Sequence, residues 1–413
     1  MKKIKILIYI TGLTGVDLHR LFLPYQECQQ INDPNISIQV GLGACKDTNE
    51  VISKMLQYDI VVYHTPIDLD IINQIKGKVI TVCDIDDYWN LTPTHPLYNT
   101  YQRLNLSYLI EQTIINSDYI TTTTEVLAEK IRPINPNVFI FPNALKRVGQ
   151  FIPNKRPSQR IRFGLIGGTS HVPDLKLLEQ VVPNLPLKIL NKVQFVLCGF
   201  DKGETTLLDD NNNEVQKIQT PWDKNIWTIW ERMLTNNYRT LSPDHLQFLL
   251  KYDIESVYND PNEPYKRRGA LPIQTYAYHY DDIDVLLAPL VKNEFNQYKS
   301  NLKVVEAAVK DTAIIASDNI PYSVDSISYL LPNGKPNPKG NCILVKQRNT
   351  PDKNAKEWIK AITYIVEHPD CLPKMKENNL NFVNANYNIT TISQQRIEFF
   401  KNIYQNNEKD NNN

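Results

Sequence analysis

Along the first 150 residues, short apolar runs alternate with segments whose apolar residues recur at helical spacing. Several runs lack the apolar–polar alternation of a strand with one face in water, which is typical of buried parallel strands covered on both faces. Strands that alternate with helices predict βαβ units and a parallel sheet. We expect strands at residues 4–10, 37–41, 60–63, 79–84, 119–122 and 138–141, and helices at 48–56, 101–116 and 125–131.

A second series of the same kind begins near residue 161. Residues 142–160 precede it, are rich in Pro, Asn, Lys and Arg, and have no clean periodicity, so we interpret them as a linker. Two such series predict an α/β protein with domains at residues 1–150 and 160–384. In the second series, strands are expected at 161–168, 193–199, 285–287, 312–316 and 342–345, and helices at 174–182, 222–234, 245–250, 302–309 and 353–367.

Residues 200–263 interrupt this rhythm and are interpreted as an insertion. They contain an Asp/Asn run at 209–213 and three tryptophans, Trp222, Trp227 and Trp230. Such tryptophans could form a stacking platform for carbohydrate, but at helical spacing they more often belong to a core.

Both ends of the chain bear on its organisation. The start, residues 1–10, has basic residues before an apolar run that is too short for a signal peptide and favours a first strand. No apolar run approaches the roughly 18–20 residues that cross a bilayer. An amphipathic helix is expected at 392–404, within a C-terminal segment 385–405, and the Asn-rich tail 406–413 is expected to be disordered.

Composition narrows the class of protein. The chain has 413 residues, 42% of them hydrophobic and 22% charged, which is ordinary for a globular protein. Lys plus Arg number 45 and Asp plus Glu number 45, so no net charge pulls the chain onto nucleic acid or an anionic membrane. The scattered cysteines form no CxxC pair and are interpreted as buried thiols in a reducing, cytoplasmic setting. They are Cys28, Cys45, Cys83, Cys198, Cys342 and Cys371.

In open α/β sheets, ligands bind beyond the carboxyl ends of the strands, so the loops there hold the candidate sites. After the first strand, Gly12 and Gly15 precede a helix expected to begin near residues 16–17. Its N-terminal N–H groups could bind a phosphate group. A tight strand–helix turn explains the glycines equally well, and the spacing is not that of a dinucleotide site.

Acidic side chains crowd the end of the fourth strand. Asp84, Asp86 and Asp87 lie within four residues, and His64 follows the third strand. Carboxylates so close must be solvated, hydrogen-bonded or paired. They are candidate catalytic residues, with a helix N-cap cluster as the alternative for the aspartates and a structural role as the alternative for the histidine.

The turn after the first strand of the second series could face a phosphate. It combines glycines, hydroxyls and a histidine before a helix whose expected N-cap is Asp174. A plain glycine turn is the alternative. The candidate phosphate-binding residues are Gly167, Gly168, Thr169, Ser170 and His171.

The most informative stretch is residues 288–308, where a buried strand, a polar loop and a helix follow one another. Ser300 is a suitable N-cap, the first N–H groups of the helix could hold a diphosphate, and two lysines add cationic donors. Glu306, one turn after Leu302, could accept both hydroxyls of a ribose, or else pair with Lys303 on an exposed helix. The candidate residues are Lys299, Ser300, Asn301, Leu302, Lys303 and Glu306.

These motifs together resemble the GT-B glycosyltransferases of the group that includes families 1 and 4. The resemblance covers nearly the whole chain. It rests on "DIDDYW" with "HPLY" at 84–98, "GGTSHVPDL" at 167–175, "PL…FNQYKSNLKVVEAA" at 289–308 and "PNA" at 142–144. An uncharacterised bacterial and phage set carries similar segments.

The resemblance implies two Rossmann-like domains with a cleft between them and a C-terminal helix that crosses back to the first domain. It implies that the first domain binds the acceptor and the second a nucleotide-sugar, with UDP favoured. It also implies retention of the anomeric configuration and no metal or other cofactor. The acceptor (a glycan, a protein or a DNA base) and the oligomeric state are left open.

The sequence departs from the family 4 pattern at two places. Tyr298 stands where those enzymes usually have a second glutamate, and the loop after residue 166 lacks the usual Arg/Lys pair. Arg267, Lys299 or Lys303 could supply the missing charge. Three other functions therefore stay open: a non-catalytic glycan- or partner-binding protein, a transferase acting on modified DNA bases through the basic run 265–268, and a nucleotide-sugar epimerase.

Overall fold

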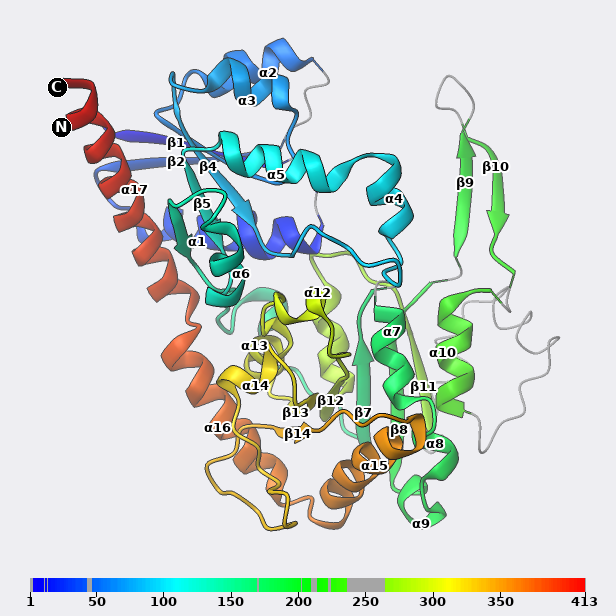
Figure 1. The fold of residues 1–413 in the computed structure, drawn as a ribbon. Coiled ribbons are helices and arrows are strands. Elements are labelled where there is room, and N and C mark those ends of the chain that lie inside the picture. The colour runs from blue at the N-terminus through cyan, green and yellow to red at the C-terminus, as the bar shows by residue number, and fades with distance from the viewer. Residues whose placement is uncertain are drawn as a thin grey trace. The chain divides into compact units, whose positions relative to one another are not determined.

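The computed structural model describes residues 3–10, 12, 14–42, 47–168, 171–201, 203–208, 214–221, 224–235 and 264–412 (Figure 1). Contacts divide the chain into two compact units. Unit 1 comprises Met1–Lys146, Asn293–Val305 and Phe382–Asn413, and unit 2 comprises Arg147–Lys292 and Glu306–Asn381. Two of the four divisions fall within helices, namely α13 (Leu302–Val309) and α16 (Cys371–Asn386).

Unit 1 is built on a six-stranded parallel sheet of order β2-β1-β3-β4-β5-β6. Ile6 of β1 lies opposite Ile60 of β3, and Val62 of β3 lies opposite Val82 of β4. The predicted parallel sheet is therefore confirmed. Its strands are β1 (Ile4–Ile10), β2 (Ile36–Leu42), β3 (Ile60–His64), β4 (Ile80–Ile85), β5 (Tyr119–Thr122) and β6 (Val138–Ile140).

Helices cover both faces of this sheet, because alternate residues of each strand point to opposite sides. Leu7 packs in one core, and its neighbours Ile6 and Ile8 pack in the other. Both faces are thus apolar, as the continuous runs predicted. The helical elements of unit 1 are η1 (Asp17–Phe22), α1 (Leu23–Ile31), α2 (Thr48–Met55), α3 (Leu69–Ile75), α4 (Tyr98–Arg103), α5 (Leu106–Asn116), α6 (Glu125–Ile131), α12 (Glu294–Gln297) and α17 (Ile389–Asn412).

The C-terminal helix α17 belongs to unit 1 and packs against α1. Phe400 of α17 lies 6.0 Å from Tyr25 of α1, centroid to centroid, and both rings are buried. The helix runs to Asn412, beyond the point at which the sequence suggested a disordered tail. The tail contains no Gly or Pro, so a helix already held by packed turns can continue through it.

Unit 2 holds a second six-stranded parallel sheet, of order β11-β8-β7-β12-β13-β14, and an antiparallel hairpin of β9 and β10. Strand β11, at the edge, was not predicted because three of its five residues are basic. The strands of unit 2 are β7 (Ile161–Ile166), β8 (Val193–Phe200), β9 (Glu204–Leu208), β10 (Glu214–Gln219), β11 (Tyr265–Gly269), β12 (Val285–Ala288), β13 (Ala313–Ser317) and β14 (Ile343–Val345).

The helix predicted at 174–182 is wrong as a single element, since the structure breaks it into three short pieces. Pro183, within the third piece, has no N–H to donate to the preceding turn. The predicted helix at 245–250 lies outside the described residues. Further elements of the second half are η2 (Gly149–Phe151), α7 (Val172–Leu175), η4 (Lys176–Leu178), α8 (Val181–Asn184), α9 (Leu187–Leu190), α10 (Ile226–Thr235), η5 (Tyr276–Asp282), α14 (Tyr322–Asp325) and α15 (Pro351–Glu367).

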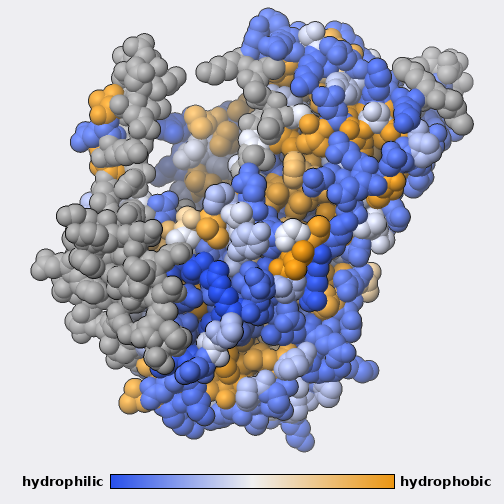
Figure 2. All heavy atoms as spheres, turned by 180° about the vertical axis from the view of Figure 1, so that it is seen from behind, coloured by the Kyte–Doolittle hydropathy of each residue, from blue (hydrophilic) through white to orange (hydrophobic). Residues whose placement is uncertain are grey.

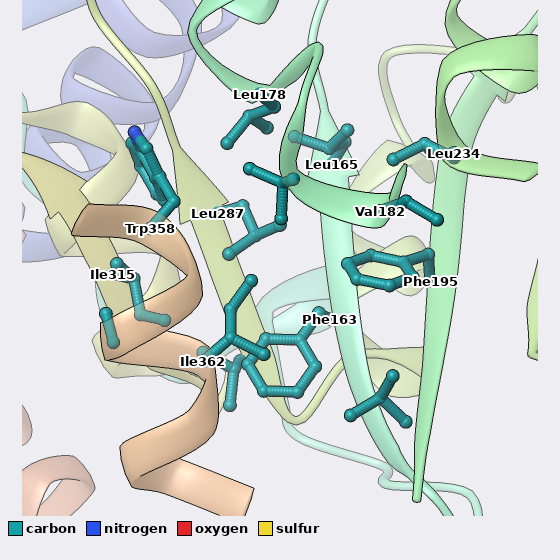
Figure 3. Packing of buried hydrophobic residues seen from close by; sticks show 14 of the residues in the cluster. Phe163, Leu165, Leu178, Val182, Phe195, Leu234, Leu287, Ile315, Trp358 and Ile362 are labelled. Atoms are coloured by element: carbon teal, nitrogen blue, oxygen red, sulfur yellow. The ribbon is translucent and has the colours of Figure 1, made fainter. Parts of the chain in front are cut away.

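The core of unit 2 lies between the sheet and α15 (Figure 3). Phe163 and Leu287 project from neighbouring strands, and Trp358 and Ile362 of α15 pack in the same cluster. Leu234 of α10 joins them. The described part of the predicted insertion therefore contributes to this core. Trp227 and Trp230 are buried there too, while Trp222 lies outside the described residues.

Hydrophilic residues cover most of the described surface on the face drawn in Figure 2, with hydrophobic patches between them. None of the described helices is long and apolar enough to cross a membrane. In the same residues, no three His, Cys, Asp or Glu side chains are grouped so that they could hold a metal ion. Five of the six cysteines are buried thiols, and Cys45 lies outside the described ranges.

Candidate functional site

At the carboxyl edge of the unit 1 sheet, Asp84 is buried in an ion pair. Its oxygens accept hydrogen bonds of 2.9 and 2.8 Å from Nε and Nη2 of Arg20, and both side chains are fully buried. Thr121 donates a further bond of 2.6 Å to the same carboxylate. Nη1 of Arg20 donates to the Phe141 carbonyl at 2.7 Å and to Oδ1 of Asn143 at 3.0 Å. The pair thus ties η1 to the ends of β4 and β6.

His64 and Asp86 form a second, partly exposed pair at this edge. Nε2 of His64 lies 3.1 Å from Oδ1 of Asp86, and Nδ1 lies 2.7 Å from the carbonyl oxygen of Thr65. Both ring nitrogens face acceptors, so the doubly protonated imidazolium fits the site best. Burial lowers the pKa of His64, but the bond to Asp86 outweighs it and the pKa is raised. At Asp86, burial raises the pKa of the carboxyl group, but the hydrogen bond from His64 lowers it. The net pKa of Asp86 is lowered.

The segment Asn293–Val305 brings residues of the second motif group to the same edge. Nζ of Lys299 lies 3.8 Å from Oδ2 of Asp87, and Nδ2 of Asn143 donates to Oγ of Ser300 at 2.8 Å. Tyr298, the residue in place of a family glutamate, packs its ring 4.5 Å from that of Tyr88. The structure therefore gathers Asp87, Lys299 and Ser300 in unit 1.

Ser300 does not cap α13 as predicted. Its hydroxyl accepts from Asn143, and the helix begins at Leu302. The carbonyl of Asn301 accepts the first backbone bonds, from Val304 at 2.8 Å and from Val305 at 3.3 Å. Asn301 therefore occupies the N-terminal position that we predicted for Ser300.

The glycine turn after β1 ends in a reciprocal capping arrangement. Oδ2 of Asp17 accepts from the backbone N–H of Thr14 at 2.9 Å, and Oγ1 of Thr14 accepts from the N–H of Asp17 at 3.2 Å. A carboxylate at the start of the helix repels a second anion. This geometry favours the turn interpretation of Gly12 and Gly15 over a phosphate site.

In unit 2, the turn after β7 holds a histidine–aspartate pair. Nδ1 of His171 lies 2.9 Å from Oδ2 of Asp174, and Oδ1 of Asp174 accepts from the N–H of Val291 at 2.8 Å. Asp174 is therefore not an N-cap, since its carboxylate joins the loops after β7 and β12. Gly167 leaves room for the ring, because a Cβ there would lie 3.2 Å from Cδ2 of His171. Thr169 and Ser170 lie outside the described residues.

Other side chains hold the neighbouring loops of this edge. Oγ of Ser317 accepts from the N–H of Leu290 at 2.8 Å, and Nδ2 of Asn319 donates to the Leu290 carbonyl at 2.7 Å. The loops after β12 and β13 are thereby held together. No sequence pattern signals these contacts, since each joins residues more than 25 positions apart.

Glu306 does not lie on an exposed helix surface, as its ion-pair alternative assumed. It is buried, with 1% of its surface exposed, and its carboxylate accepts from the hydroxyls of Tyr276 and Tyr280, the latter at 2.7 Å. Burial, followed by the charge of Glu306, raises the pKa of both tyrosines. The reason lies in packing that the sequence does not reveal: η5 places two phenols on the carboxylate.

The basic run of β11 also pairs within unit 2. Arg267 is buried, donates to Glu231 from Nε at 2.7 Å and from Nη2, and lies 3.7 Å from the Phe200 ring centroid. Lys266 and Arg268 lie 3.0 and 3.2 Å from the Asp282 carboxylate. These contacts place Arg267 in the core and account for the run without a nucleic-acid ligand.

Solved structures share this fold over almost the whole chain. The Anabaena protein HepE, crystallised with UDP and glucose, matches with a TM-score of 0.59 and 10% identity over 97% of this chain and 100% of its own. An α-glucosyltransferase bound to UDP-glucose and to DNA with an abasic site matches with a TM-score of 0.58, 12% identity and the same coverage. An α,α-trehalose 6-phosphate synthase from Burkholderia multivorans matches with 0.54, 10% identity, and 98% and 99% coverage.

No protein-family model matches the sequence, and no curated protein matches it either. Identities of 10 to 12% establish the fold alone. Together with the two parallel six-stranded sheets, these matches show that the chain has the GT-B fold, which is built from two Rossmann-like domains.

Proposed function

We propose that the chain is a glycosyltransferase that moves a sugar from a nucleoside-diphosphate sugar, preferably a UDP-sugar, to an acceptor hydroxyl. We further propose that it uses no metal and retains the anomeric configuration. One observation carries the proposal above the others. Two proteins whose structures hold UDP or UDP-glucose share the fold over 97% of this chain and all of their own.

On the donor side, the start of α13 supports a diphosphate site. The N–H groups of the first turn, at Asn301 and Leu302, and the side chain of Lys303 offer positive charge there. Lys299 and Ser300 precede them in the chain. Because the proposed reaction uses no metal, stabilisation of the leaving diphosphate must come from such groups.

We propose that Glu306 binds the ribose. Its contacts with two tyrosines limit how a ribose can reach it. Its oxygens accept from Tyr276 and Tyr280 and the residue is buried, so a ribose hydroxyl reaches the carboxylate only if one phenol moves aside. Tyr276 is the less buried of the two and is the one expected to move. The nucleotide and the Tyr276 hydroxyl therefore compete for one carboxylate oxygen.

On the acceptor side, Asp86 and Asp87 are proposed to accept hydrogen bonds from the acceptor's hydroxyl groups. His64, as an imidazolium between Asp86 and the Thr65 carbonyl, holds Asp86 in place and cannot itself accept a proton. Asp84 is fully committed to Arg20 and supports the end of β4.

The test is a thermal-shift titration of the full chain with UDP, GDP, CDP, ADP and dTDP. A ligand at about 100 times its Kd stabilises by about 2.7 kcal/mol, which gives a measurable rise in Tm. We expect a rise with UDP that falls in Glu306→Gln and persists or grows in Tyr276→Phe, because that variant loses the competing hydroxyl.

Glu357→Gln, a change at a glutamate of α15 that pairs with Arg348, is the matched control and should leave the shift unchanged. A Tm that no nucleotide raises would contradict the proposal and favour a non-catalytic binding protein. A rise with UDP that Glu306→Gln leaves intact would remove Glu306 from the site. Conversion of a UDP-sugar without any acceptor would favour an epimerase.

A further inference from the structure

The loop after β7 offers one basic side chain to a donor. Residues 167–175 read Gly-Gly-Thr-Ser-His-Val-Pro-Asp-Leu, so His171 is its sole titratable cation. A diphosphate leaving group gains a negative charge on the oxygen that departs from the sugar. Any stabilisation from this loop must therefore come through the imidazole or through neutral donors.

The geometry of the pair determines which nitrogen of His171 meets a ligand. Nδ1 lies 2.9 Å from the carboxylate of Asp174, and the side chain of Asp174 is only 5% exposed. The other Asp174 oxygen is held by the N–H of Val291. The imidazole is 29% exposed, and Nε2 has no hydrogen-bond partner in the part of the chain that the structure describes.

The surroundings leave space beside this ring. Gly167 accommodates Cδ2, the carbon bonded to Nε2, and a Cβ at Gly168 would meet no atom of the described residues within 4 Å. The turn therefore borders open space at the carboxyl edge of the sheet, where ligands of α/β folds bind.

We propose that Asp174 is a positioning residue that holds His171 as an imidazolium, and that the Nε2–H of His171 binds the diphosphate of the donor. This inference rests on the proposed function. Because Nδ1–H is engaged by Asp174, a neutral ring would present a lone pair at Nε2 and repel a phosphate oxygen.

In the transfer step, the bond between the anomeric carbon and the β-phosphate oxygen breaks, and its electron pair stays on that oxygen. The acceptor hydroxyl oxygen forms the new bond to the anomeric carbon, and its proton passes to the departing diphosphate. The imidazolium keeps its own proton and donates a hydrogen bond to the oxygen as negative charge develops there.

The test compares binding of UDP and uridine, which differ only by the diphosphate. In Asp174→Asn, the amide can still accept from Val291, but it donates to Nδ1 and leaves a neutral ring that retains an Nε2–H. Replacing a charge-assisted bond by a neutral one should weaken UDP binding about five- to tenfold. Uridine binding should stay within about twofold.

The His171→Lys variant distinguishes a role of Asp174 in positioning the cation from a role in folding. In a His171→Lys background, the cation no longer depends on Asp174, so adding Asp174→Asn should cost little further UDP affinity. Asp352→Asn, at an exposed aspartate of α15, is the control for loss of one carboxylate in the same unit.

Each result decides one question. If the unaltered chain does not bind UDP, the proposed function fails before the inference is reached. Suppose that the unaltered chain binds UDP. If Asp174→Asn then weakens the binding of UDP and of uridine equally, or weakens neither, the His171–Asp174 pair is structural and the inference is overturned. The inference would also be overturned if Asp174→Asn lowered the UDP affinity of the His171→Lys variant as much as that of the unaltered chain.

Discussion

His279 should make unit 2 sensitive to acid. Its side chain lies in η5 with 2% of the residue exposed, and neither ring nitrogen has a hydrogen-bond partner among the described residues. Burial, reinforced by the charge of Arg268, lowers the pKa of His279 to about 4. In the unfolded chain the pKa of histidine is about 6.5, so the unfolded state takes up the proton first as the pH falls.

The direction and the size of the change in stability follow from the difference between the pKa of His279 in the folded and in the unfolded chain. A histidine whose pKa is lowered by folding costs stability below pH 6.5, and the loss is complete below pH 4. A shift of about 2.5 units corresponds to about 3 kcal/mol, of which about 2 kcal/mol is lost by pH 5. Replacing His279 by leucine, which has a similar volume and no polar atoms, should remove this loss while leaving stability at pH 7.5 unchanged or higher.

The assay is urea unfolding at pH 7.5, 6 and 5, followed by tryptophan fluorescence, since four of the five tryptophans belong to unit 2. We expect His279→Leu to exceed the unaltered protein by about 2 kcal/mol more at pH 5 than at pH 7.5. His368→Gln, at an exposed histidine of the same unit, serves as the control. A difference that does not change with pH would refute the reasoning.

Three further changes test the packing of each unit by urea unfolding. Arg20→Met leaves Asp84 buried without its cation and should cost about 3–5 kcal/mol, so a loss below about 1 kcal/mol would contradict a buried pair. Ile362→Ala removes a fully buried side chain from the unit 2 core and should cost about 2–5 kcal/mol, and a near-neutral change would mean that α15 packs differently. Asp17→Ala breaks the reciprocal cap with Thr14 and should cost about 0.5–2 kcal/mol, whereas tighter UDP binding in this variant would revive the phosphate interpretation of the turn.

The strands could be predicted from sequence because most are buried on both faces. The strands at 4–10 and 119–122 have the predicted bounds, since both are rich in the β-branched and aromatic residues that favour strands. Strand β11 is not predicted, because its charges are neutralised by Glu231 and Asp282, which lie elsewhere in the sequence. A local pattern does not contain such pairings.

The candidate sites show the same limit. The motif around Asp84 stands out because three aspartates crowd one strand end, and Glu306 stands out because apolar residues flank it. Their partners, Arg20 and the two tyrosines of η5, lie more than 20 residues away. The sequence therefore indicated where polar groups gather at the strand ends, but not which of them are open to a ligand. The assigned roles of these residues remain predictions.

The measurement that tests the central claim most directly is titration calorimetry of the full chain with UDP, with uridine and inorganic phosphate as comparisons. The proposed donor site predicts one UDP bound per chain, more tightly than uridine and far more tightly than phosphate, because the nucleoside and the diphosphate are held together. Absence of saturable UDP binding, or equal affinity for UDP and phosphate, would contradict a nucleotide-sugar site in this fold.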